Sequence, residues 1–209
     1  MAGNREFVNR RIHSLLGVIP IGAFLVVHLV VNHFATHGEA SFNHAVSFME
    51  SLPFLIFLEI FLIYLPLLFH AIYGFYIAFT AKNNVSRLGF FRNWMFLLQR
   101  VSGIIVFIFL AWHVYETRIK VALGQETLDF HMMENVLSNP VMFIFYIIGV
   151  LATIFHFSNG LWSFLVSWGI TQSPRSQQIS SYVMLVVFVV LSVIGLRALF
   201  AFAYPGWFA

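Results

Sequence analysis

VVHLVV, at residues 26–31, places a single histidine, His28, inside a long apolar run. Three further apolar runs each carry one histidine in the same way: PLLFHAIYG (66–74, with His70), FLAWHVYE (109–116, with His113) and ATIFHFSNG (152–160, with His156). A fifth apolar run, near residues 181–203, has no histidine. Ionisable side chains inside a bilayer are rare, costly and usually functional. Four of them in four separate segments therefore call for a common explanation.

The composition indicates an integral membrane protein. Of the 209 residues, 60% are apolar and only 9% are charged, and 26 are phenylalanine. A soluble domain carries about 25% charged residues, so this chain lacks the polar surface that a soluble fold of its size needs. The absence of cysteine excludes disulfides, thiolate zinc sites and iron–sulfur ligation by the chain itself. The net charge of +3 is small and gives no indication of nucleic-acid binding.

Five apolar segments are long enough to cross the hydrocarbon core, which takes about 20 helical residues. We expect an all-α fold with one domain over residues 1–209. Its five transmembrane helices are expected at about 12–34, 53–80, 97–119, 140–168 and 181–203. Pro66 should kink the second helix one turn before His70. Residues 35–52 form a polar connection with room for a short surface helix.

The basic residues predict the orientation. With the N-terminus in the cytoplasm and the C-terminus outside, the inner side would hold Arg5, Arg10, Arg11, Lys82, Arg87, Arg92, Arg100 and Arg175. The outer side would hold only Arg118, Lys120 and Arg197. This bias follows the positive-inside rule. The acidic residues expected outside are Glu39, Glu50, Glu116, Glu126, Asp129 and Glu134, with Glu59 in the outer part of the second helix.

The histidines fall at two depths when the rise of about 1.5 Å per helical residue is applied. His28 and His113 lie in the outer half of the membrane, and His70 and His156 lie in the inner half. A bis-histidine haem needs one imidazole on each of its faces. We therefore predict two stacked b-type haems enclosed by the first four helices. His28 pairs with His113 on the outer iron, and His70 pairs with His156 on the inner iron.

Further residues are expected to contact the haems. Gly74 and Gly160 each follow an inner ligand by four residues, which leaves space on the same helix face. Gly17 falls near the level of the inner haem, and arginines at the inner surface match propionates with a bidentate fork. The expected contact residues are Arg11, His13, Ser14, Gly17, Gly74, Arg100, Ser102 and Gly160. A solvated interfacial histidine remains an alternative for His13, and an interhelical hydrogen bond remains one for any single transmembrane histidine.

Several longer stretches carry a resemblance to a known family. They are GNREFVNRRIHSLLGVIP (3–20), HLVVNHFATHG (28–38), YIAFTAKNN (76–84), GFFRNWMFLLQRVSGI (89–104) and IFHFSNGLWSFLVSWGIT (154–171). In these stretches the chain resembles the di-haem cytochrome b membrane subunit of succinate:menaquinone oxidoreductase, of the Bacillus type. The resemblance covers nearly the whole chain. The axial histidines of that family fall on His28, His70, His113 and His156.

The resemblance implies a subunit of a larger enzyme in a bacterial cytoplasmic membrane. A flavoprotein subunit with FAD would oxidise succinate on the cytoplasmic side. An iron–sulfur subunit would pass the electrons to this membrane anchor. Two b haems would then deliver them to menaquinone near the outer face. The chain itself would not oxidise succinate.

A quinone that is reduced near the outer face also needs protons. Glu59 is the sharpest candidate for a proton relay, because a carboxylate in the outer part of a transmembrane helix is costly. An interfacial glutamate that reaches the headgroups is the simpler alternative. Glu50, His33 and His44 are weaker candidates.

Two other functions stay open at this stage. The same architecture could serve a quinol:fumarate reductase, in which electrons run in reverse. A haem-free transporter or structural membrane protein is the alternative from a different class.

Overall fold

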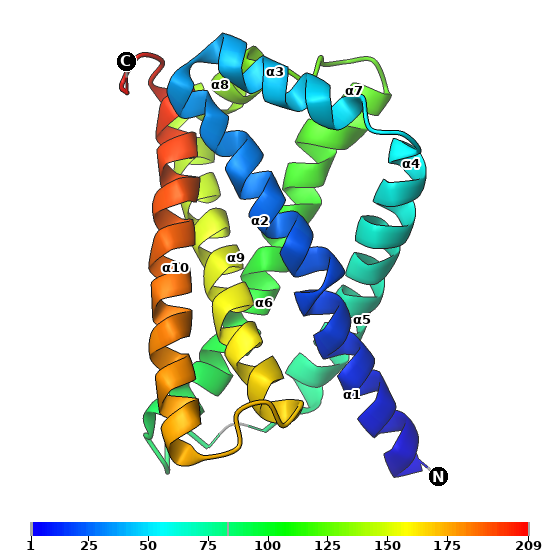
Figure 1. Cartoon of the computed structure of the whole chain (residues 1–209), viewed down its shortest axis with the longest axis vertical. Helices are drawn as coiled ribbons and strands as arrows, with labels where there is room; N and C mark the ends of the chain where they lie inside the picture. Colours follow the sequence, from blue (N-terminus) through cyan, green and yellow to red (C-terminus); the bar gives the residue numbers. More distant parts are fainter. Residues whose placement is uncertain (1, 83, 209) are drawn as a thin grey trace.

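The computed structural model describes residues 2–82 and 84–208, and every regular element within these ranges is helical. Figure 1 shows a bundle of long helices, with the chain termini at opposite ends. We call these the N-terminal end and the C-terminal end of the bundle. Five helical segments are long and apolar enough to cross a membrane. The all-α fold with five transmembrane segments is therefore confirmed.

The first transmembrane segment consists of two helices, α1 (Ala2–Val18) and α2 (Pro20–His33), followed by a 3₁₀ turn (Phe34–His37). Pro20 begins the second of these because proline lacks the N–H that would continue the helical ladder. Helix α1 also extends through the polar stretch that precedes the predicted apolar span. Arg10 and Glu6 form an ion pair at 2.8 Å one turn apart there.

The second segment changes its hydrogen-bonding pattern along its length. It begins as α4 (Leu55–Leu58), continues as a π-helix, η2 (Glu59–Tyr64), and ends as α5 (Leu65–Thr80). Pro66 is at the start of α5, directly after the change from π to α hydrogen bonding, and the kink expected at this proline stays a prediction.

The third and fifth transmembrane segments are longer than the predicted spans, whereas the fourth ends within one residue of its predicted span. The third is α6 (Phe91–Val114), followed by a π-helix, η3 (Tyr115–Ile119), and α7 (Lys120–Ala122). The fourth is α9 (Pro140–Ser167), and the fifth is α10 (Pro174–Ala203). Ser173 caps α10 through a reciprocal pair of hydrogen bonds with Ser176, which explains why this helix begins before its apolar run.

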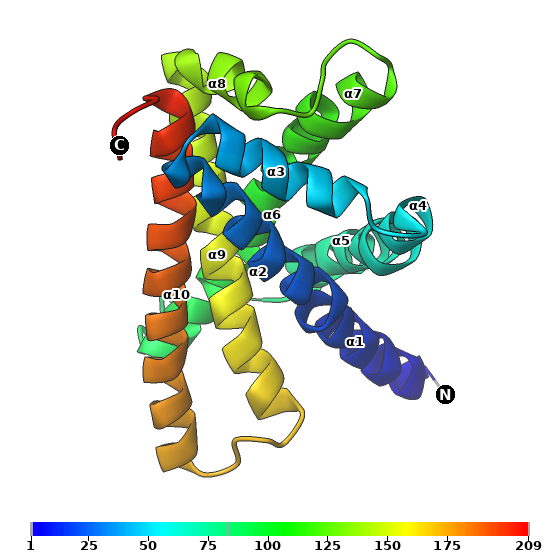
Figure 2. The same cartoon turned by 45° about the horizontal axis from the view of Figure 1, so that its top comes forward.

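Two amphipathic helices lie across the C-terminal end of the bundle, as Figure 2 shows. They are α3 (Glu39–Glu50), within the predicted polar connection, and α8 (Phe130–Ser138), which was not predicted. Their apolar faces meet α10, where the rings of Phe42, Phe130 and Phe202 pack together with centroids 4.9 to 6.2 Å apart. These two helices cover the hydrophobic core at the C-terminal end of the bundle.

The transmembrane segments do not pack equally closely. Helix α9 packs extensively against both α6 and α10, whereas α5 packs mainly against α1. Figure 2 shows α4 and α5 leaning away from α9 and α10. Many large apolar side chains stay exposed along the five segments, as expected for a surface that faces lipid. The arrangement leaves the histidines of α2, α5, α6 and α9 facing the interior between the helices.

Candidate functional site

The structure brings the four histidines together as two pairs. The rings of His28 (α2) and His113 (α6) lie 5.8 Å apart between centroids, and their planes are inclined by 76°. The rings of His70 (α5) and His156 (α9) lie 6.2 Å apart and are inclined by 85°. These are the partners that the depth of each residue in its helix predicts. All four side chains are partly buried.

The spacing within each pair fits an iron between two imidazoles. Imidazole–metal bonds are about 2 Å long, so two axial ligands place their ring centres roughly 6 Å apart. Among the described residues, no group of three or more histidine, aspartate or glutamate side chains could hold a metal ion. Each pair consists of two imidazoles, which is the number that a haem iron takes from the protein in bis-histidine ligation.

Hydrogen bonds orient the imidazoles of His70 and His156. The Nδ1 of His70 donates to the backbone carbonyl of His13 at 3.0 Å. The Nδ1 of His156 donates to the carbonyl of Gln99 at 3.0 Å, and Ser102 Oγ lies 3.2 Å from the same nitrogen. A nitrogen that faces a carbonyl oxygen must carry the proton. Each Nε2 therefore keeps its lone pair for a metal.

Gln99 also fixes the contact between α6 and α9. Its side-chain Nε2 donates to the carbonyl of His156 at 3.0 Å, while its Oε1 accepts from Asn159 Nδ2 at 2.7 Å. These bonds hold the two helices in a single register around His156. The amino-acid sequence gives no sign of this role for Gln99 and Asn159, because the two side chains meet only in the folded structure.

His113 has a different kind of partner. Its Nδ1 lies 3.4 Å from the hydroxyl oxygen of Tyr146, and this hydroxyl donates to Glu116 Oε2 at 3.2 Å. Tyr146 is 1% exposed and Glu116 is 8% exposed. Glu116 is one of the acidic residues expected on the outer side, and its position in η3 buries it within the protein.

His28 is the least constrained of the four. Its Nε2 accepts from Asn32 Nδ2 at 3.3 Å, and the same amide donates to the carbonyl of His28 at 2.8 Å. A metal bond from His28 Nε2 would replace the first contact and leave the second.

Glycines provide the space around the His70 and His156 pair. A Cβ atom on Gly17 would come within 2.5 Å of His70 Cε1, and one on Gly103 would come within 3.0 Å of His156 Cε1. A Cβ on Gly74 would meet His13 Nε2 at 3.3 Å, and one on Gly160 would meet Gln99 Nε2 at 3.2 Å. The predicted glycines thus lie against the pair or against the residues that orient it.

Among residues 2–82 and 84–208, the buried nitrogens His13 Nε2 and Arg100 Nη2 have no hydrogen-bond partner. His13 stacks on His70 with ring centroids 4.0 Å apart, and its Nε2 has no hydrogen bond. Arg100 donates through Nη1 to the carbonyl of Ala81 at 2.6 Å, and no described residue pairs with its Nη2. Unsatisfied buried donors are costly. Imidazole and guanidinium nitrogens without a partner among the described residues are suited to bind carboxylates, such as those of haem propionates.

Arg11 and Ser14 make other contacts. The guanidinium of Arg11 lies over the rings of Phe7 and Trp168, at 5.0 and 5.3 Å. Ser14 Oγ accepts from the indole nitrogen of Trp168 at 3.0 Å. These contacts join α1 to the end of α9, and no contact with the four histidines is found in the described part of the chain.

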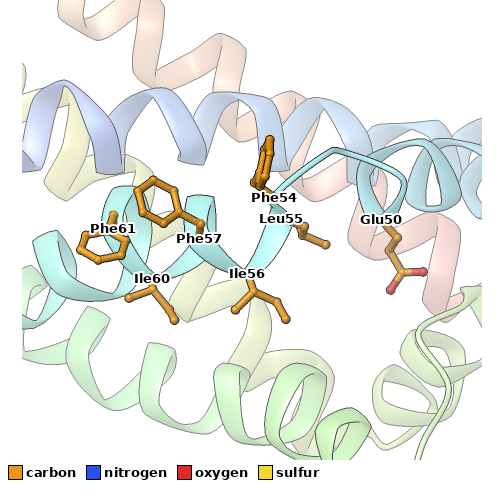
Figure 3. A pocket seen from close by; sticks show the side chains of 7 residues that line it. All are labelled: Glu50, Phe54, Leu55, Ile56, Phe57, Ile60 and Phe61. Atoms are coloured by element: carbon orange, nitrogen blue, oxygen red, sulfur yellow. The ribbon is translucent and has the colours of Figure 1, made fainter.

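Glu59 is paired with a basic residue. Its Oε1 accepts from Arg118 Nη2 at 2.6 Å, which links the two π-helical segments η2 and η3. A hollow near the C-terminal end of the bundle is lined by Glu50 and by six apolar side chains between Phe54 and Phe61. Figure 3 shows Glu50 set apart from these apolar side chains, on the neighbouring helix α3.

Comparison with known proteins agrees with this architecture. Residues 80–195 match the family model of the succinate dehydrogenase/fumarate reductase transmembrane subunit. The succinate dehydrogenase cytochrome b558 subunit of Bacillus subtilis (strain 168) is 64% identical over 202 residues, covering 97% of this chain and 100% of the relative. The chain belongs to the succinate dehydrogenase/fumarate reductase transmembrane subunit family. The predicted family is therefore confirmed, and the chain is a multi-pass membrane subunit of this oxidoreductase family.

Proposed function

We propose that this member of the family anchors a succinate dehydrogenase and carries electrons from an iron–sulfur subunit to menaquinone through two b haems. The pairing of four histidine rings across four transmembrane segments, at 5.8 and 6.2 Å, carries the proposal. Each haem, when bound, would supply a one-electron carrier. The similarity to a succinate dehydrogenase subunit favours the succinate-oxidising direction over fumarate reduction.

The residues of the chain would bind and orient the haems. His28 and His113 would ligate one iron, and His70 and His156 would ligate the other. The Nδ1 hydrogen bonds of His70 and His156 support this assignment because they direct Nε2 towards the metal. His13 and Arg100 would hold propionates with the nitrogens that pair with no described residue, and Gly17, Gly74 and Gly160 would leave room for the macrocycle or its edge.

The orientation of the chain decides which haem receives electrons first. We place the N-terminal end in the cytoplasm, as the distribution of lysine and arginine supports. The iron–sulfur and flavoprotein subunits would then dock at this end, next to the His70 and His156 pair. FAD and the iron–sulfur clusters would belong to these partners, so succinate would not be oxidised by this chain.

Menaquinone would be reduced near the C-terminal end of the bundle, towards the outer face of the membrane. Its reduction takes two electrons and two protons. The hollow lined by Glu50 and the apolar side chains between Phe54 and Phe61 supports this placement because it combines apolar walls with one carboxylate (Figure 3). Glu59 remains the proposed proton relay, and its ion pair with Arg118 gives it a structural role that must be tested separately.

An optical spectrum of the purified complex tests this proposal. We expect the dithionite-reduced minus oxidised spectrum to contain two b-type components, with two haems counted per copy of this chain. A preparation with the partner subunits but no haem in this chain would overturn the proposal. The four histidines would then form a haem-free polar network.

A further inference from the structure

The hydrogen bonds of the proposed ligands differ between the two pairs. His70 and His156 each donate Nδ1–H to a neutral backbone carbonyl. His113 instead faces the hydroxyl of Tyr146, which is bonded to the carboxylate of Glu116. The two pairs have similar ring spacings, at 5.8 and 6.2 Å, so it is the hydrogen bonding that distinguishes them.

The direction of these bonds follows from the number of protons available. A tyrosine hydroxyl has one proton, and Tyr146 donates it to Glu116 Oε2 at 3.2 Å. Towards His113, 3.4 Å away, the same oxygen can therefore only accept. The Nδ1 of His113 must carry a proton, and its Nε2 is left as the metal-binding nitrogen. The imidazole therefore donates to the hydroxyl, and the hydroxyl donates to the carboxylate, which is the final acceptor.

The buried surroundings of Tyr146 and Glu116 strengthen these hydrogen bonds. Tyr146 and Glu116 are almost completely buried, and bonds that end on a charged group in a low-dielectric interior polarise their neighbours. Glu116 is within the π-helical segment η3, one turn after His113. Lys120 Nζ lies 4.0 Å from the other oxygen of Glu116, which helps to keep the carboxylate in place.

We propose that Tyr146 and Glu116 are positioning residues that act through His113 to lower the midpoint potential of the haem bound by His28 and His113. Withdrawal of the Nδ1 proton towards a carboxylate makes the imidazole a stronger electron donor. A stronger donor stabilises ferric iron relative to ferrous iron, which lowers the potential. The inference rests on the proposed haem ligation by this pair.

A redox titration of the complete complex, followed by its optical spectrum, tests the inference. Tyr146→Phe removes the hydroxyl and changes no charge. Glu116→Gln keeps an acceptor for Tyr146 but removes the negative charge. We expect both variants to shift the midpoint potential of the His28–His113 component upward and to leave the His70–His156 component unchanged. Glu126→Gln, in the exposed loop that follows α7, is the matched control for loss of one acidic charge and should shift neither component.

The outcomes separate this inference from the function on which it rests. An unchanged potential in Tyr146→Phe, with both components present, would overturn the inference and leave the haem ligation intact. A shift in Glu116→Gln that Glu126→Gln reproduces would also overturn it, since a general field effect would suffice. If Tyr146→Phe does not retain the haem, the comparison of Glu116→Gln with Glu126→Gln decides. A wild-type complex without the His28–His113 component would instead refute the proposed function.

Discussion

Gly17 lies directly against the ring of His70, such that a Cβ atom on Gly17 would come within 2.5 Å of His70 Cε1. We predict that Gly17→Ala displaces this imidazole and weakens binding of the haem between His70 and His156. Changes next to a metal ligand typically cost about 10- to 100-fold in affinity. The fraction of complex that retains the corresponding spectral component measures the effect.

Gly89→Ala is the matched control for this substitution. The nearest atoms to a Cβ on Gly89 are 4.0 Å away, so the added methyl group meets no close neighbour. Both haem components should be retained in this variant. Full occupancy of both sites in Gly17→Ala would show that the close approach to His70 has no functional consequence.

Glu59→Gln tests the proposed proton relay. Loss of a general acid or base typically costs about 10²- to 10⁴-fold in rate, so we expect quinone reduction to slow by at least about tenfold. The spectra of both haems should stay intact, because Glu59 contacts neither histidine pair. The measurement is the rate of menaquinone reduction by succinate in the reconstituted complex.

Arg118→Gln separates this relay from the ion pair of Glu59. The variant removes the same 2.6 Å contact but leaves the carboxylate available to carry protons. We expect Arg118→Gln to be less impaired than Glu59→Gln. Equal losses of rate in the two variants would assign Glu59 to holding η2 against η3.

The direction of electron transfer predicts a response to membrane potential. In the proposed orientation, electrons move from the cytoplasmic side outward, and a potential that is negative inside favours this movement. A complete crossing corresponds to about 2.3 kcal/mol per charge per 100 mV. An imposed potential of this sign should therefore accelerate succinate oxidation by menaquinone in vesicles, and an uncoupler should slow it. A rate independent of potential would contradict the outward path.

The contacts of His131 with two glutamates predict that the stability of the folded protein depends on pH. Its Nδ1 lies 2.7 Å from Glu134 and its Nε2 lies 3.2 Å from Glu39, and these carboxylates raise the pKa of His131 above its usual 6.5. The hydrogen bond to Glu134 is the largest cause. A raised pKa stabilises the folded state at pH values below 6.5, and the contribution disappears as the pH rises through the higher folded value.

The comparison of wild type with His131→Gln measures this contribution. We expect the wild type to unfold at a higher temperature than the variant at pH 5.5, and the difference to vanish at alkaline pH. The effect should be small because the side chain is exposed. A difference that grows with pH would contradict the ion pairs of His131 with Glu39 of α3 and with Glu134 of α8.

Much of the fold could be predicted because the bilayer imposes strong constraints on sequence. Runs of about 20 apolar residues have few structural alternatives. The ends of the helices were harder to predict because they depend on local capping, such as that of Ser173, and on polar turns that remain helical outside the membrane. Helix α8 is short and is held by tertiary packing of Phe130 against α10, a contact that local pattern does not reveal.

The histidine pairs could also be predicted, since depth along a helix follows directly from residue number. Their hydrogen-bond partners could not. Tyr146 is far from His113 in sequence, and nothing in its own apolar segment distinguishes it from a packing residue. Glu116 was assigned only to the outer side, because hydropathy does not show that the π-helical turn of η3 buries it beside Tyr146.

The most direct test of the central claim is the reduced-minus-oxidised spectrum of four variants of the complete complex, each with one proposed ligand replaced by alanine. We predict that His28→Ala and His113→Ala lose the same spectral component, and that His70→Ala and His156→Ala both lose the other. Loss of different components within either pair, or retention of both components in any of the four variants, would contradict the proposed ligation.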